Sequence, residues 1–281
     1  MMGEKGIVLG FVGSPNKDGR TNELVRAALE GAAGAGAQTE LVHMADHVVA
    51  ACKDCLPWVC MTELKCTYED KAFEYLSHKV LNCGALVLGT PVYWWDTSGI
   101  VKYFILKMFR VYARSAPLQG LPAFGISIAG GTGNGLVSGL RPVYHFFQMM
   151  QMRALDPLPA TRFNFDAALK QAGELGSRIA AMSNQRSPFS KLEERLLWYD
   201  ELPYLGLSRS AERRLLAALT AMVDAGKGDP DKQFGLAKAE VFEAAGRKIE
   251  SLSEITRVYE AGVKAFTKGE STFSLRSPSG A

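Results

Sequence analysis

Apolar runs rich in β-branched residues alternate with amphipathic segments over the first two-thirds of the chain. The continuous apolar runs are at 6–13, 39–44, 84–93 and 122–130. A strand that is apolar along its whole length is buried on both faces, which is typical of a parallel sheet covered by helices on each side. The alternation therefore predicts a parallel α/β sheet.

Helical periodicity fills the intervals between these runs. Segments with apolar residues at helical spacing begin at Thr21 and recur at 68–82, 98–113, 135–151 and 166–184. Pro142 is expected to kink or to start the fourth of them, and a short fifth strand is expected near 152–158. Five strands separated by helices predict a doubly wound sheet of the flavodoxin type, in the strand order 2-1-3-4-5. The ligand of such a sheet binds beyond the carboxyl ends of the strands.

The pattern changes near NQRSPFS, residues 184–190. Beyond it, 211–226 and 233–269 are helical in pattern, and 198–208 is predicted to be an aromatic connector. We expect a sheet domain at 1–186, which includes a four-cysteine loop at 52–66, and a helical C-terminal extension at 187–281. The extension is expected to serve assembly or to cover the ligand site, because LLWYDELPYLGL is too aromatic to be left in water.

Charge and hydropathy exclude several classes of function. The 281 residues carry a net charge of +3 without a basic stripe, so neither a nucleic-acid nor a membrane partner is expected. No stretch approaches the roughly 18 apolar residues that span a bilayer, and no signal peptide is apparent. We therefore expect a cytoplasmic protein, in which clustered cysteines bind metal or act in redox chemistry more often than they form structural disulfides.

The loop after the first strand has the pattern of an anion site. GSPNKDGRTN, residues 13–22, joins a buried strand to a helix, so its amides lie at the positive end of the helix dipole. Arg20 adds a positive charge, and short polar side chains are supplied by Ser14, Asn16, Thr21 and Asn22. The spacing is neither that of a Walker A loop nor that of the dinucleotide fingerprint. A strand–helix turn capped by polar residues, with no ligand, is the alternative.

Two further loops follow the third and fourth strands. TPVYWWDTSG, residues 90–99, has three consecutive aromatic residues that cannot all face a core, so some of them are expected against a flat ligand or in an oligomer interface. AGGTGNG, residues 129–135, allows the backbone to approach a ligand closely. All three loops leave the carboxyl ends of parallel strands, so they are expected to surround one site.

In order and spacing, these loops resemble the NAD(P)H-dependent FMN reductase family of the flavodoxin-like fold. The four-cysteine segment followed by YED is similar to the iron–sulfur flavoprotein branch of that family, and the resemblance extends from about residue 6 to 184. It implies that the first loop holds the FMN phosphate and that the other two lie beside the isoalloxazine ring, with Lys102 nearby. The residues it assigns to FMN are Ser14, Asn16, Arg20, Thr21, Asn22, Pro91, Val92, Tyr93, Trp94, Ser98, Gly130 and Gly131.

Four of the five cysteines lie close together in the sequence, at Cys52, Cys55, Cys60 and Cys66. Four such thiolates can enclose one [4Fe–4S] cluster or one tetrahedral Zn²⁺ ion; a redox disulfide, or no bound group, is the third possibility. The resemblance favours the iron–sulfur cluster, although this chain has two more residues between the second and third cysteines than the family branch. Cys83, before a buried strand, is expected to be a core residue.

The resemblance implies an FMN-dependent oxidoreductase. Such an enzyme takes electrons from NADH or NADPH and passes them through FMN, with a [4Fe–4S] cluster, to an acceptor such as a quinone, a small organic molecule or a redox protein. The resemblance also implies a homodimer or homotetramer in which the cluster of one subunit faces the flavin of another, and it assigns no catalytic acid or base. A non-enzymatic electron carrier supplied by a ferredoxin is the alternative, and a zinc-binding module without flavin is a third hypothesis.

Overall fold

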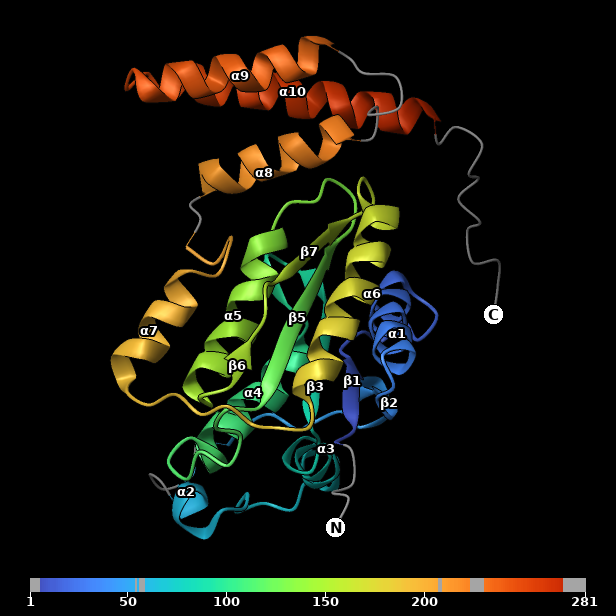
Figure 1. Ribbon diagram of the computed structural model, residues 1–281, viewed down its shortest axis with the longest axis vertical. Helices are drawn as coiled ribbons and strands as arrows, with labels where there is room; N and C mark the ends of the chain where they lie inside the picture. The colour runs from blue at the N-terminus through green and yellow to red at the C-terminus, as the bar shows by residue number, and fades with distance from the viewer. Residues whose placement is uncertain (1–5, 54, 56–58, 207–208, 223–229, 270–281) are drawn as a thin grey trace. The chain divides into compact units, whose positions relative to one another are not determined.

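The computed structural model describes residues 6–53, 55, 59–206, 209–222 and 230–269 (Figure 1). The chain divides into two compact units. The first comprises the chain up to Thr161 together with Phe165–Gly206, and the second comprises Arg162–Asn164 and the chain from Leu207 onward.

The first unit is built on one sheet with the strand order β2-β1-β3-β5-β6. Its strands are β1 (Val8–Val12), β2 (Thr39–His43), β3 (Ala85–Tyr93), β4 (Asp96–Thr97), β5 (Pro122–Ala129), β6 (Arg153–Ala154) and β7 (Leu158–Thr161). Every pairing is parallel except that of β4, which folds back on β3. Because β6 and β7 both pair with β5, they share the place of the predicted fifth strand. The flavodoxin-like sheet is therefore confirmed.

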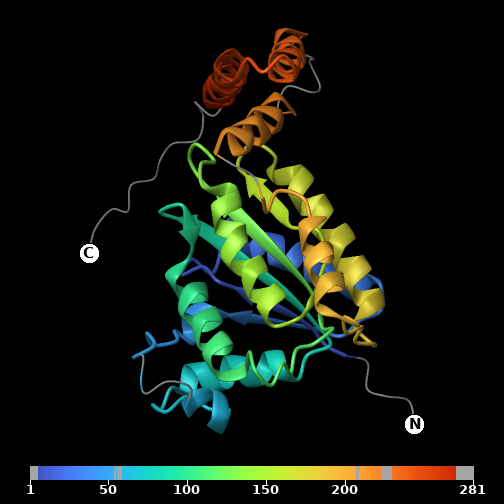
Figure 2. The ribbon, with the colours of Figure 1, turned by 90° about the vertical axis from the view of Figure 1, so that its left-hand side faces the viewer.

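Helices cover both faces of this sheet (Figures 1 and 2). One face carries α1 (Arg20–Gly34) and α6 (Phe165–Met182), and the other carries α3 (Lys71–Leu81), α4 (Gly99–Tyr112) and α5 (Leu136–Met149). Side chains of β1 alternate between the two cores: Val8 and Val12 lie under α1 and α6, whereas Leu9 and Phe11 lie under the other helices. The continuous apolar runs of the sequence are explained by this double burial.

Glycines allow α1 and α6 to pack unusually closely. A Cβ atom added at Gly31 would lie 2.0 Å from the carbonyl oxygen of Gly173, and one added at Gly176 would lie 1.9 Å from that of Ala28. Any larger residue at either position would force the two helices apart.

The structure contains short elements that the sequence pattern does not predict. They are a 3₁₀ turn η1 (Met44–Asp46), α2 (Val59–Glu63) within the cysteine segment, the strand β4, and α7 (Leu192–Asp200). The predicted connector at 198–208 is thus partly helical. Pro142 lies inside α5 and does not start that helix.

The aromatic residues in and just before α7 are shielded from water because they pack beside β6. The indole Nε1 of Trp198 donates to the carbonyl of Ala154, and the hydroxyl of Tyr199 donates to that of Met152, each at 2.8 Å. The Arg153 guanidinium lies 3.9 Å from the ring centroid of Phe189. These contacts explain why residues 187–206 belong to the first compact unit.

The second unit is helical, as the sequence predicts. It contains α8 (Arg209–Met222), α9 (Pro230–Ala244) and α10 (Lys248–Gly269). The predicted helical stretch 233–269 is two helices, because the chain turns between them at Gly246, whose φ is +73°. α10 packs against both α8 and α9. Across the described residues, no helix combines the length and apolar character needed to cross a membrane.

Candidate functional site

The first two of the three loops expected to form a site are joined by hydrogen bonds at the carboxyl edge of the sheet. The amide of Gly13 donates to the carbonyl of Gly89 at 2.8 Å, and the hydroxyl of Ser98 donates to the carbonyl of Gly13 at 2.5 Å. A Cβ atom at Gly13 would lie 2.1 Å from the Val101 side chain. The first loop therefore has to pass the start of α4 as bare backbone.

The first loop ends in a helix start, that of α1, whose N-cap residue, Gly19, has no side chain with which to cap it. The loop before it is folded by local bonds, from the Asn16 amide to Ser14 Oγ and from the Asp18 amide to Asn16 Oδ1, each 3.1 Å long. Uncapped amides at the start of a helix attract an anion. Exposed Arg20 lies beside them, with its guanidinium 5.2 Å from the ring centroid of Phe165.

Other predicted residues of this loop are buried. The Thr21 methyl group would contact a Cβ atom placed at Gly89, and the Asn22 carboxamide oxygen accepts a 3.2 Å hydrogen bond from the Nε of Arg26. Ser14, Thr21 and Asn22 are each less than 8% exposed. Their side chains support the loop, whereas Asn16 and Arg20 form its exposed surface.

The aromatic loop is a tight hairpin between β3 and β4. Val92 pairs with Thr97 and Tyr93 with Asp96, so Trp94 and Trp95 are the only turn residues. Their φ angles are +51° and +59°. Trp94 is 90% exposed. Its ring lies edge-to-face with the Trp95 ring, and the two ring centroids are 5.9 Å apart.

The glycine loop that follows β5 offers accessible backbone. A Cβ atom at Gly130 or Gly131 would meet nothing within 4 Å, and Gly131 has a φ of +51°. Gly135, the N-cap of α5, packs against Val92 and Trp95. Pro91 is buried beside Ile128 in the β3–β5 pairing. The loop is therefore fixed at one end and open at the other.

Two threonines that the sequence analysis did not single out hold the hairpin in place. Thr90 and Thr97 are buried, and their hydroxyl oxygens lie 2.6 Å apart. The Ser98 amide donates to Thr90 Oγ1 at 3.0 Å, which connects the hairpin to the Ser98–Gly13 bond. Only the pairing of β3 with β4 brings these two residues together, so no spacing rule would have identified them.

His43 is another residue that the sequence analysis left without a role. It ends β2 and pairs with Val12, immediately before the first loop. Burial, and after it the positive charge of Lys17, lower the pKa of its imidazole. Among the described residues, its buried Nδ1 atom has no hydrogen-bond partner, and the lowered pKa favours the neutral ring at this edge of the site.

A flavin nucleotide fits the residues that are present. Its phosphate requires amide donors and a positive charge, which the start of α1 and Arg20 provide. Its planar ring requires flat apolar surface and close backbone, which the exposed Tyr93 and Trp94 and the open Gly130 and Gly131 provide.

The four clustered cysteines do not converge. Cys60 lies buried in α2, and its thiol donates to the carbonyl of Arg110 at 3.3 Å. The Cys55 thiol lies 3.4 Å from the hydroxyl of Thr67, and Cys52 and Cys66 are half-buried. Among the residues that the structure describes, no group of three or more His, Cys, Asp or Glu side chains could hold a metal ion. Residues 56–58, within the stretch that lengthens the cysteine spacing, lie outside the described residues.

The cysteine segment is fastened at its base by a buried ion pair. The carboxylate of Asp70 accepts from the Lys107 ammonium, and it accepts 3.0 Å hydrogen bonds from the amides of Ala50 and Phe73. Burial opposes ionisation of Asp70, but these hydrogen bonds and the Lys107 charge outweigh it and lower the pKa. Asp70 thus joins the two ends of the segment to α4.

The remaining cysteine is a core residue, as predicted. Cys83 is 6% exposed, and its thiol donates to the carbonyl of Val80. Burial raises the pKa of this thiol to about 12, which keeps it protonated and unreactive at neutral pH.

Comparison with known proteins gives a family match and several similar proteins. The family model for NADPH-dependent FMN reductases matches residues 7–157, more than half of the chain. An iron–sulfur flavoprotein of Methanocaldococcus jannaschii is 27% identical over 187 residues, which are 62% of this chain and 95% of that protein. One from Archaeoglobus fulgidus is 27% identical over 177 residues, or 61% of this chain and 78% of that protein. Among solved structures, a flavone reductase aligns over 64% of this chain and 66% of its own with 15% identity and a TM-score of 0.49.

Proposed function

The chain belongs to the NADPH-dependent FMN reductase family, and on this premise we propose that it takes electrons from NADPH or NADH through FMN and passes them to a separate acceptor. The observation that carries the proposal is the joining of two features at one sheet edge. An uncapped helix start with Arg20 lies on one loop, an exposed aromatic hairpin lies on the next, and the Ser98–Gly13 bond connects them.

We assign binding roles to the residues around this edge. The amides at the start of α1, with Arg20 and Asn16, hold the phosphate, while Ser14, Thr21 and Asn22 keep the loop in shape. Tyr93 and Trp94 cover one side of the ring, and the backbone of Gly130 and Gly131 lies along the other. Pro91, Val92 and Ser98 fix the hairpin against β5 and the first loop.

FMN supplies the hydride and one-electron chemistry when it is bound. The side chains need only bind the flavin, orient it and shape access to its ring, so none is assigned as a catalytic acid or base.

Spectra and kinetics of the purified protein test this function. We expect a flavin absorption spectrum and steady-state oxidation of NADPH or NADH with an artificial acceptor. A protein that binds flavin, does not oxidise either nucleotide and accepts electrons from a reduced ferredoxin would be the electron carrier of the alternative hypothesis. A colourless protein that takes up no FMN would refute both.

We further propose that Cys52, Cys55, Cys60 and Cys66 bind an iron–sulfur cluster. Support comes from the donor set, since thiolates are the usual ligands of such clusters, and from two relatives named as iron–sulfur flavoproteins. The described conformation does not fit the cluster, because Cys60 is turned into the core, so α2 has to move before all four thiols meet. We derive no step of the reaction through it.

Metal analysis of anaerobically purified protein tests the cluster. About four irons and four sulfides per chain are expected, and serine at any one of the four positions should lower both while FMN stays bound. Cys83→Ser is the matched control and should leave the iron content unchanged. One zinc ion without sulfide would refute iron–sulfur binding.

We also propose that the protein is a homodimer or homotetramer in which the cysteine segment of one subunit faces the flavin site of another. Within one chain, Ser98 and Arg110 lie at opposite ends of α4, which separates the flavin loops from Cys60 by about 18 Å of helix. A monomeric mass in light scattering would contradict this arrangement.

A further inference from the structure

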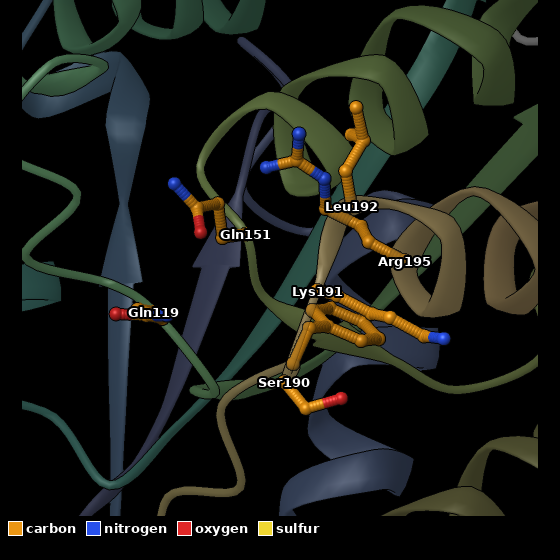
Figure 3. A pocket seen from close by; sticks show the side chains of 7 residues that line it. Gln119, Gln151, Ser190, Lys191, Leu192 and Arg195 are labelled. Carbon is orange, nitrogen blue, oxygen red and sulfur yellow. The ribbon is translucent and has the colours of Figure 1, made fainter.

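A polar pocket of about 270 Å³ lies on the first unit, outside the proposed flavin site (Figure 3). It is lined by Gln119, Gln151, Phe189, Ser190, Lys191, Leu192 and Arg195. Gln119 and Gln151 precede β5 and β6, so the pocket lies at the amino ends of these strands. The flavin loops leave the carboxyl ends, and the two sites are therefore at opposite edges of one sheet.

The pocket contains two cationic side chains that have no counterion in the part of the chain that the structure describes. Neither Lys191 nor Arg195 forms an ion pair with any residue that the structure describes. The Arg195 Nε–H group is buried and has no hydrogen-bond partner among the described residues. Leaving such a charged donor unpaired is costly, and an unpaired buried polar group points to a missing partner.

The acid next to Arg195 in the sequence is already engaged elsewhere. Glu194 accepts from the amide and the hydroxyl of Ser190 and from the guanidinium of Arg153. The Ser190 amide first, and then Arg153, lower its pKa to about 2. Its charge is therefore committed to Arg153, and none of the described side chains that line the pocket is acidic.

The remaining donors around the pocket are also available. No hydrogen bond to a described residue involves the side-chain amide of Gln119 or Gln151, and Lys191 is the N-cap of α7 without capping it. Figure 3 shows the Arg195 guanidinium and the Gln151 amide turned to the same side, with Lys191 extending the other way. The pocket thus offers the Arg195 guanidinium and glutamine amides as donors, while the Lys191 ammonium would have to turn to reach the same bound group.

We propose that this pocket binds a small molecule through an oxyanion, a phosphate or a carboxylate, with Arg195 as the principal contact. The planar guanidinium donates two parallel hydrogen bonds to either group. Gln151 and Gln119 add neutral donors, and the amides at the start of α7 add the positive end of a helix dipole.

Calorimetric titration of the purified full-length protein with inorganic phosphate, and separately with malonate, tests the proposal. At least one anion should bind saturably, and the stronger of the two identifies the preferred oxyanion. Arg195→Met should weaken this binding at least tenfold, because a charge-assisted hydrogen bond is lost. Lys170→Met, which removes an exposed charge from α6, is the matched control and should bind as the wild type does.

Gln151→Gly provides a second test that does not depend on the folding of the arginine variant. Gln151 has a φ of +59° after the end of α5, a position that glycine occupies without strain, so this substitution should not lower the melting temperature. It should nevertheless weaken anion binding. Absence of saturable binding by both anions would overturn the proposal, as would wild-type affinity in either pocket variant. These outcomes are independent of flavin binding.

Discussion

Trp94 and Trp95 occupy turn positions that glycine and asparagine usually fill. Two-residue hairpin turns with positive φ at both positions favour Asn-Gly, because a side chain with a Cβ atom is strained there. Trp95 gains contacts with Gly135 in return, but Trp94 is exposed and gains little. Strain of this kind persists mainly at functional sites, which agrees with the role proposed for the hairpin.

Relief of this strain is measurable as a gain in stability. Trp94→Asn should raise the free energy of unfolding by about 0.5–1 kcal/mol, because asparagine tolerates the left-handed conformation better than tryptophan does. Urea unfolding measures the change. Trp95→Asn is the comparison and should not stabilise the protein, since it loses the packing on Gly135. Equal destabilisation by both substitutions would contradict the strain at Trp94.

Ser98 is predicted to be both a structural and a positioning residue. Ser98→Ala removes the donor to the buried Gly13 carbonyl and the cap of α4, so it should destabilise the protein by about 1–3 kcal/mol. It should also weaken FMN binding, because the first loop loses its link to the hairpin. Ser115→Ala, which removes an exposed hydroxyl near the end of the same helix, should change neither property. A stable Ser98→Ala variant with unchanged FMN affinity would refute the role.

At the scale of elements, α7 depends on contacts that the sequence pattern does not reveal. Arg153 lies over the Phe189 and Trp198 rings while it donates to Ser187 and Glu194. One arginine on a short strand thereby holds a helix some forty residues later in the chain. This network predicts two measurable effects.

The first effect is a pH dependence from Glu194. Its folded pKa of about 2 lies below the ordinary 4.5, so its contribution to stability is complete above pH 4.5 and is lost as the pH falls towards 2. Glu194→Gln should therefore be less stable than the wild type at pH 6, and the difference should be smaller at pH 3. Urea unfolding at the two pH values measures it, and a difference independent of pH would contradict the Glu194 pairing.

The second effect concerns where the chain can be shortened. A protein ending at residue 186 loses Phe189, Trp198 and Tyr199 from its core, whereas one ending at residue 206 keeps them. The shorter chain should be less stable by at least about 3 kcal/mol. If both truncated proteins unfold at the same urea concentration, the contacts of α7 do not stabilise the first unit as described.

The elements that the sequence predicts are those with a strong local pattern. The β-branched runs of β1, β3 and β5 and the periodic helices between them are recognisable because each is buried in a regular way. The hairpin is missed because Trp94–Trp95 is not a usual turn pair, and α7 is missed because its aromatic residues do not follow one face.

The candidate site is partly predictable for a similar reason. Loops at the carboxyl ends of successive parallel strands have to meet, so the three sequences identify one edge of the sheet. Which of their residues are exposed depends on tertiary packing. Thr21 and Ser98 turn inward, and Thr90 and Thr97 meet only through the β3–β4 pairing.

At the scale of the whole molecule, the proposed flavin site, the clustered cysteines and the cationic pocket lie in different parts of the first unit. The carboxyl edge of the sheet holds the proposed flavin site, the segment on α4 holds the cysteines, and the amino edge holds the cationic pocket. We propose that the second unit, α8 to α10, serves assembly or access to the flavin. Removal of residues 207–281 should then change the mass in solution or the acceptor kinetics, and no change in either would refute it.

The most direct test of the flavin site is titration of the flavin-free protein with FMN and with riboflavin, followed by flavin fluorescence. The two ligands differ only in the phosphate, so a site built on the α1 start and Arg20 should bind one FMN per chain at least about 100-fold more tightly than riboflavin. Arg20→Glu should lose most of that preference, and Lys170→Glu should keep it. Equal affinity for FMN and riboflavin, or no binding of either, would contradict the assignment of the first loop as the phosphate site.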